Sequence, residues 1–183
     1  MFENFQRWFA LQQLRRHYRK QGDETLSFSR AVANVRQILI CIPLNPDEFR
    51  VARYVLKFLA SEDENHSITF ILPEDYMNTL PHRSHDRLIP IRETARDKLG
   101  RFLPELMEKV LDRDYQAAAD LNTRFDFGTS LLCRKTNAPL RIGFASDDAD
   151  IFFNIEIQKP EDKFLLEGAY RSIQRLLAID NKS

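Results

Sequence analysis

Short apolar runs alternate with amphipathic stretches along this chain. Residues 37–43 (QILICIP) form a nearly continuous apolar run in which every second residue is isoleucine, a pattern that is typical of a strand covered on both faces. A helix is expected to follow, because Asn45 can act as its N-cap and Pro46 fits the first helical position. This stretch therefore predicts one strand–helix unit of a parallel sheet.

The same alternation continues along the chain. Further strands are predicted at 67–72, 87–91, 117–122, 140–144 and 151–157. Helices or helical turns are predicted at 74–80, 101–111, 128–135 and 161–179. Strands that alternate with helices favour a doubly wound, mostly parallel sheet with helices on both faces. The predicted fold class is therefore α/β, of Rossmann-like type.

The N-terminal segment is a helix of a different kind. Residues 2–20 contain neither glycine nor proline, and Gly22 ends the predicted helix. Aromatic side chains crowd its first turns and basic side chains fill the later ones. These residues are Phe2, Phe5, Trp8, Phe9, Arg15, Arg16, Arg19 and Lys20. The predicted organisation is a basic amphipathic helix over 1–21, a polar linker over 22–35 and one Rossmann-like domain over 36–183.

The apolar side of this helix must be covered, since Phe2, Phe5 and Phe9 share one side at 100° per residue. Three covers stay open. They are the chain's own domain, a protein partner or second copy, and an anionic membrane surface that would attract the basic residues. Because a polar linker separates the helix from the domain, we expect the cover to be external.

Charge and composition argue against several classes of protein. The chain has 27 basic and 27 acidic residues, so its net charge gives no reason to expect a nucleic-acid partner. No apolar run approaches the roughly 18 residues of a membrane span, and the N-terminus lacks the features of a secretory signal. We expect a cytoplasmic protein, peripheral at the inner membrane face if lipid covers the helix. Cys41 and Cys133 lie in apolar runs and are expected to be reduced and buried.

Motifs for cofactors and metals are absent from the sequence. None of its five glycines falls in a GxGxxG or GxxxxGK[ST] pattern, so no nucleotide cofactor is expected. His82, His85 and Asp86 have the appearance of metal ligands, but no second cluster supplies further ligands, and no metal is expected. No GxSxG nucleophile elbow is present.

Two polar groups are expected at the carboxyl edge of the sheet, where open α/β folds place ligands. Asp47 and Glu48 open the first helix of the domain, and they could serve as a general base or simply cap that helix. The second group follows the strand at 117–122 and could bind a ligand or only turn the chain. Its members are Asp120, Asn122, Thr123 and Arg124.

The stretch from Tyr115 to Phe144 resembles a known family. It has Asp-Leu at 120–121, Leu-Leu at 131–132 on a helix, and Arg-Ile-Gly-Phe at 141–144. These are similar to the YDLVIDLQ and GAxRRIGF stretches of the bacterial lipopolysaccharide heptosyltransferases, glycosyltransferase family 9. The resemblance implies the N-terminal, acceptor-side domain of a GT-B enzyme, in a short stand-alone form with a basic leader helix.

The sequence departs from that family at two places. The family's Gly-Asp in the first loop is replaced around Pro46, so the resemblance implies Asp47 or Glu48 as the acceptor-activating base. The chain also ends where the family's sugar-nucleotide domain would begin. We therefore expect a non-catalytic or degenerate glycosyltransferase-like domain that acts as a binding and interaction module. A heptosyltransferase-like subunit that needs a separate donor-binding domain, and a sensor of a sugar or nucleotide, stay open as alternatives.

Overall fold

The computed structural model describes residues 2–19, 35–57, 66–160 and 165–177. Within these residues the chain forms a six-stranded sheet in which all neighbouring strands are parallel. The strands are β1 (Gln37–Cys41), β2 (Ser67–Pro73), β3 (Arg87–Ile91), β4 (Ala117–Asp120), β5 (Leu140–Phe144) and β6 (Ile155–Ile157). The predicted α/β fold with a parallel sheet is confirmed.

The strand order is β3-β2-β1-β4-β5-β6. The chain therefore builds outward from β1 in one direction, returns, and builds outward from β4 in the other. The neighbouring strands β1 and β4 form the topological switch point, which is where open α/β sheets bind ligands. Strand β3 lies at the sheet edge, and an edge strand can accept a proline such as Pro90.

The helices of the described residues follow the predicted alternation. They are α1 (Phe2–Arg19), α3 (Pro46–Leu56), α4 (Pro104–Val110), α5 (Phe127–Lys135) and α6 (Leu166–Leu176). Three single turns, η2 (Glu74–Tyr76), η3 (Glu93–Ala95) and η4 (Ala149–Ile151), complete the list. Several predicted bounds were wrong, since the helical turn predicted over 74–80 ends at Tyr76 and the strand predicted over 117–122 ends at Asp120. The helix predicted from 101 begins only at Pro104, since proline fits the first turn, and the strand predicted from 151 begins at Ile155 after η4.

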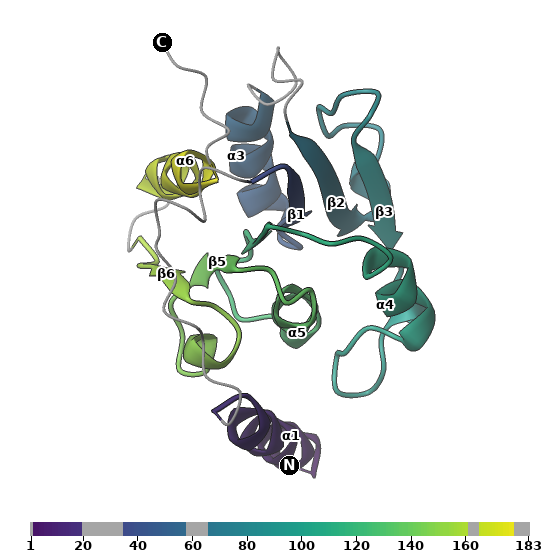
Figure 1. Ribbon diagram of the computed structural model, residues 1–183, viewed down its shortest axis with the longest axis vertical. Helices are drawn as coiled ribbons and strands as arrows, with labels where there is room; N and C mark the ends of the chain where they lie inside the picture. The colour runs from purple at the N-terminus through teal and green to yellow at the C-terminus, as the bar shows by residue number, and fades with distance from the viewer. Residues whose placement is uncertain (1, 20–34, 58–65, 161–164, 178–183) are drawn as a thin grey trace.

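Helices cover both faces of the sheet (Figure 1). On one face α3 and α6 pack over isoleucines of β1 and alanines of β4, with Phe49, Tyr170 and Ile173 in the same apolar cluster. On the other face α4 and α5 pack over Leu39 and Cys41. The two clusters explain why β1 is apolar at every position from Ile38 to Cys41.

The start of α3 agrees with the prediction. The Asn45 side chain accepts hydrogen bonds from the backbone amides of Asp47 (2.9 Å) and Glu48 (3.2 Å), and Pro46 occupies the first turn. This cap fixes where the loop after β1 ends. It thereby sets the positions of both candidate carboxylates.

Helix α1 packs on the domain through Leu11, Leu14 and Tyr18. Leu11 is buried at 7% exposure, and Arg15 donates hydrogen bonds to Asp148 (3.4 Å) and Asp150 (3.1 Å) beside η4. Trp8 and Phe9 remain 55% and 52% exposed. The side chains of Phe2, Phe5, Arg19 and Lys20 lie outside the described residues, as does the predicted linker except for Val35, which is buried. An external cover for the aromatic side stays a prediction.

The histidine-rich loop has a structural role. Asp86 accepts hydrogen bonds from the backbone amides of Arg83 (2.8 Å) and Ile68 (3.1 Å), and the rings of His82 and His85 contact backbone carbonyl oxygens. Within the described residues, no three histidine, cysteine or acidic side chains gather in a way that could hold a metal ion.

Two other features concern the whole set of described residues. Cys41 and Cys133 are free thiols and both are buried, as predicted. None of the helices in the described part of the chain is long and apolar enough to span a membrane.

Candidate functional site at the sheet switch point

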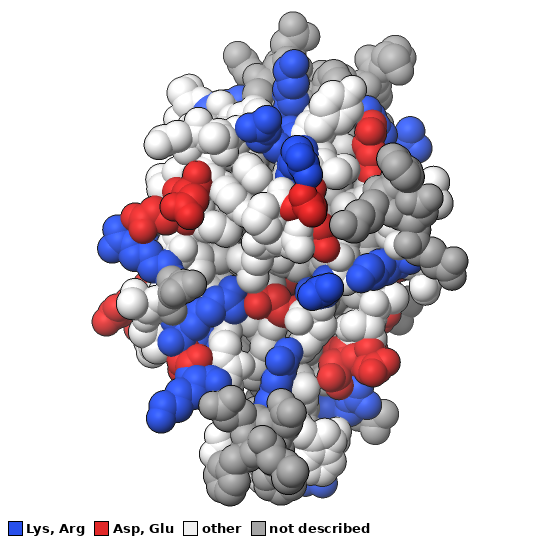
Figure 2. Space-filling model, turned by 180° about the vertical axis from the view of Figure 1, so that it is seen from behind, with Lys and Arg blue, Asp and Glu red and all other residues white. Residues whose placement is uncertain are grey.

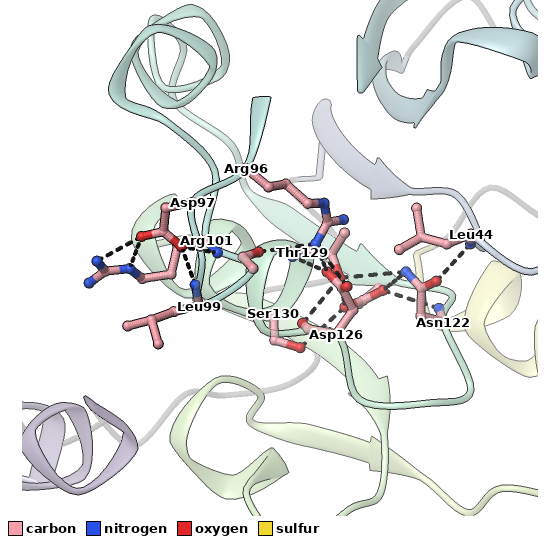
Figure 3. A network of polar contacts seen from close by, with 11 residues as sticks. Leu44, Arg96, Asp97, Leu99, Arg101, Asn122, Asp126, Thr129 and Ser130 are labelled. Carbon is pink, nitrogen blue, oxygen red and sulfur yellow. Dashed lines mark hydrogen bonds and ion pairs between the residues drawn. The ribbon is translucent and has the colours of Figure 1, made fainter. Parts of the chain in front are cut away.

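The loops that follow β1 and β4 are joined directly at the switch point. The backbone amide of Leu44, after β1, donates a hydrogen bond of 2.8 Å to Oδ1 of Asn122, after β4 (Figure 3). In open α/β sheets the loops part at this point and leave a crevice for the ligand. Here a buried side chain links the two loops.

A second link lies beside the first. Both the hydroxyl (2.5 Å) and the backbone amide (3.2 Å) of Thr123 donate hydrogen bonds to the carboxylate of Glu48 in the first turn of α3. Thr123 is buried. Both carboxylate oxygens of Glu48 therefore accept hydrogen bonds from Thr123.

Asp47 points away from this pair. Its carboxylate is 61% exposed and accepts a hydrogen bond of 2.5 Å from Arg50, one turn along α3. The two carboxylates that the sequence proposed as alternative bases therefore lie on different sides of α3. Glu48 lies at the switch point, whereas Asp47 lies on the outer surface of α3.

Asp120, the last residue of β4, is the most buried carboxylate of the site, at 2% exposure. It accepts hydrogen bonds from the Thr129 hydroxyl (2.6 Å), from the Asn122 side chain (2.7 Å) and from the Ser130 hydroxyl (3.3 Å). Burial raises the pKa of Asp120 to about 6, although the hydrogen bonds from Thr129 and Asn122 oppose the shift. Asp120 therefore organises the polar interior beneath the two links.

Asp126 continues this network to the start of α5. Its side chain accepts from the backbone amide of Thr129 (2.9 Å) and so caps the helix. Arg96, from the loop after β3, donates to Asp126 (2.9 Å) and to the carbonyl oxygen of Gly100 (3.0 Å). Figure 3 shows that these side chains converge from three loops. A carboxylate and an arginine thus occupy the helix start, where other α/β proteins bind phosphate.

Gly128 permits this close approach. A Cβ atom at this position would lie 2.7 Å from the Gly100 carbonyl oxygen and 2.9 Å from Nη1 of Arg96. Any side chain would displace the loop after β3. The glycine therefore serves packing between loop and helix.

Helix α6 closes the site from the other face of the sheet. The Tyr170 hydroxyl donates a hydrogen bond of 3.0 Å to the carbonyl oxygen of Leu121. Burial, with the charges of Glu48 and Asp120 nearby, raises the pKa of Tyr170 well above its usual range. The phenol therefore stays protonated and serves as a donor to the β4 loop.

The structure brings together most of the residues proposed from the sequence. Glu48, Asp120, Asn122 and Thr123 share one network, whereas Arg124 is exposed next to it. Sequence reasoning missed four residues of the network, which are Arg96, Asp126, Thr129 and Ser130. The Asp126-x-x-Thr129 spacing is an N-cap signal that could have found two of them.

Comparisons with known proteins bear on the fold. A scan of the sequence against protein-family models gives no match, and a search of the curated proteins gives none either. Solved structures do match. A glycosyl transferase family 9 protein from Veillonella parvula has a TM-score of 0.58 at 14% identity, and covers 81% of this chain and 42% of its own. Escherichia coli heptosyltransferase WaaC, solved with ADP-2-deoxy-2-fluoro heptose, has a TM-score of 0.59 at 13% identity. That match covers 80% of this chain and 50% of the WaaC chain.

Over about 80% of its length, this chain has the fold of part of these family 9 structures. A third structure, the E. coli ADP-heptose lps heptosyltransferase II, agrees with a TM-score of 0.50 at 16% identity. The resemblance found at residues 115–144 is thereby confirmed for the fold. The chain spans between 39% and 50% of the length of these structures.

Proposed function

We propose that this chain is a glycosyltransferase-like domain that acts as a binding and interaction module and does not itself transfer a sugar. The observation that carries the proposal is the engagement of Glu48 and Asn122 across the switch point. A sugar acceptor would need that crevice open and a carboxylate aimed into it.

The chemistry of the network also supports this function. A general base must reach the proton that it removes, within about 3 Å or through one water. Glu48 is bound to Thr123, Asp120 lies beneath the loops, and Asp126 caps α5 and pairs with Arg96. Because each carboxylate is already engaged within the chain, these contacts favour a structural role for the loops over a catalytic one.

The shared fold makes two classes of small ligand worth testing, which are nucleotide sugars and acceptor sugars. ADP and an ADP-linked heptose are bound in structures of E. coli WaaC. A sensor or an active half-enzyme would bind a nucleotide sugar or an acceptor sugar at the same edge. An interaction module with a closed edge would bind neither.

A thermal-shift panel tests the proposal on the full chain. It uses ADP-sugars, UDP-sugars and free heptoses, each at millimolar concentration. A ligand at 100 times its dissociation constant stabilises a protein by about 2.7 kcal/mol, which raises the melting temperature by several degrees. We expect no shift with any of these compounds. A saturable shift with a nucleotide sugar would favour the sensor, and a shift with a free heptose would favour the acceptor-side enzyme.

A further inference from the structure

Helix α1 is fixed to the domain by a charged anchor. Nη2 of Arg15 donates hydrogen bonds to the carboxylates of Asp148 (3.4 Å) and Asp150 (3.1 Å). The same atom donates to the carbonyl oxygen of Asp147 (3.3 Å). All three acceptors belong to the turn that contains η4. The side chains of Arg15 and Asp150 are 28% and 62% exposed, so dissolved salt can screen this anchor.

Two further contacts of α1 also depend on an arginine charge. The guanidinium of Arg7 lies over the Phe125 ring, 5.4 Å from its centroid. The guanidinium of Arg134, on α5, lies over the ring of Tyr18 on α1, at 4.3 Å. A cation in this position is attracted electrostatically by the face of the ring. Charged groups therefore hold α1 near both of its ends as well as at Arg15.

The apolar part of the contact is small. Among the described side chains of α1, Leu11 alone is buried, at 7% exposure. Leu14 is half-buried and lines a groove of about 850 Å³ that runs between α1, α4 and α5. Because closely packed protein interiors leave few voids larger than a water molecule, the groove marks an incompletely packed side of α1. The helix can therefore leave the domain without breaking a close-packed core.

A packed pair of aromatic rings joins the contacts of the two arginines. The rings of Phe125 and Phe152 have their centroids 5.6 Å apart. Phe152 directly follows η4, which contains Asp150, a partner of Arg15. Arg7 lies over the ring of Phe125 itself. Both arginines of α1 therefore act on the same aromatic pair.

Phe125 belongs to the loop that closes the switch point. Two residues before it, Thr123 donates two hydrogen bonds to Glu48 of α3. Three residues before it, Asn122 accepts a hydrogen bond from the backbone amide of Leu44. Docked α1 thus contacts one end of a loop whose other end is bonded across the sheet.

We infer that α1 is a releasable strap that keeps the loop after β4 closed on the switch point. With α1 docked, Arg7 restrains Phe125, and the hydrogen bonds of Thr123 and Asn122 are maintained. Once α1 leaves, this restraint is lost and those hydrogen bonds open more often. Because coupling between two sites is reciprocal, any event that opens the loop also favours release of α1. The inference goes beyond the proposed function, since it holds whether or not the switch point binds a sugar.

The experiment compares the full wild-type chain with Arg15→Gln and Arg16→Gln. Arg16 is the matched control, because it is the next residue of the same helix and is exposed. Arginine and glutamine have similar helix propensities, so neither substitution changes the helix itself. Hydrogen exchange, followed by mass spectrometry, measures the protection of α1 and of residues 121–126 separately. The amides of β2, in the other half of the sheet, report global stability.

We expect exchange in Arg15→Gln to be about fivefold faster than in wild type, both in α1 and at residues 121–126, as the loss of exposed ion pairs implies. Exchange in β2 should be unchanged, and Arg16→Gln should behave as wild type. About 1 M sodium chloride should speed exchange of the same two segments in wild type and have less effect in Arg15→Gln. On the face shown in Figure 2 acidic and basic side chains are interspersed, so salt should not act there through a surface of one sign.

Three results would overturn the inference. Equal exchange of α1 in the two variants would mean that Arg15 does not anchor the helix. Faster exchange in α1 with no change at residues 121–126 would mean that α1 does not restrain the loop. Faster exchange in β2 by the same factor would mean that the substitution lowers global stability and releases no strap. None of these results alters the thermal-shift test, which decides the proposed function separately.

Discussion

Thr123 donates two hydrogen bonds to Glu48, one from its hydroxyl and one from its backbone amide. The pair joins the loop after β4 to the first turn of α3, 75 residues apart in the sequence. It stands at the point of the sheet where related folds admit a ligand. The first prediction concerns its contribution to stability.

Glu48→Gln is expected to lower the free energy of unfolding by about 1–3 kcal/mol. The reason is that hydrogen bonds to a charged acceptor contribute about that much and glutamine cannot accept both. Asp47→Asn is the matched control, because its exposed pair with Arg50 should contribute at most about 1 kcal/mol. Urea unfolding of both variants measures the difference. Equal effects would show that Glu48 does not hold the β4 loop.

The second prediction concerns the pH dependence that Asp120 imposes. Its folded pKa of about 6 lies above the unfolded value of about 3.9. Between these pH values the native state holds a proton that the unfolded state has released, so the free energy of unfolding falls as pH rises. The total fall due to this group is about 3 kcal/mol.

Asp120→Asn should remove that component. Relative to wild type, the variant is expected to become more stable by about 2 kcal/mol between pH 4 and pH 7. Its amide can still accept from Asn122, and Thr129 can donate to Asp126 at 3.1 Å instead. Urea unfolding at several pH values gives the difference curve. A flat curve would mean that Asp120 is ionised in the native state at pH 4.

The third prediction compares two glycines. A Cβ atom on Gly143 in β5 would lie 2.4–2.5 Å from the Phe153 ring, whereas nothing lies within 4 Å of a Cβ on Gly168 in α6. Gly143→Ala should cost about 1–3 kcal/mol through overpacking. Gly168→Ala should stabilise by up to about 1 kcal/mol, since alanine is the better helix former. Chemical denaturation measures both, and a tolerated alanine at position 143 would refute the close packing there.

The fourth prediction concerns the two thiols. Sγ of Cys41 lies 3.9 Å from Sγ of Cys133, and both residues are fully buried. Burial raises the pKa of Cys41 well above its usual range, which disfavours the reactive thiolate. Both should react with an aromatic disulfide reagent only as fast as the protein opens. Fast labelling of either thiol under native conditions would show that it is accessible.

The sequence predicted the scaffold well because local patterns determine it. The apolar run at β1 and the Asn45-Pro46 helix start both appear where expected. Amphipathic periodicity also identified α1, but not its docked side. That side depends on Leu11 and on the contact of Arg15 with Asp148 and Asp150, which lie far along the chain.

The sequence predicted where the candidate site lies in the sheet, but not which partners its side chains contact. Both polar groups follow strands of a predicted parallel sheet, so Glu48, Asp120, Asn122 and Thr123 were expected at its carboxyl edge. Whether they face a ligand or one another depends on loop geometry and on partners such as Thr129, which looks like an ordinary helix residue in the sequence. No spacing rule reports that Asn122 bonds to the amide of Leu44.

The most direct test of a closed switch point follows the backbone amides of Leu44 and Thr123 by NMR during titration with a nucleotide sugar. Each amide donates to a side chain across the switch point, Leu44 to Asn122 and Thr123 to Glu48. We predict that both amides are protected from hydrogen exchange and that their chemical shifts stay unchanged on titration. Rapid exchange of both amides, together with saturable shifts on adding the nucleotide sugar, would contradict the proposed closed, non-catalytic edge.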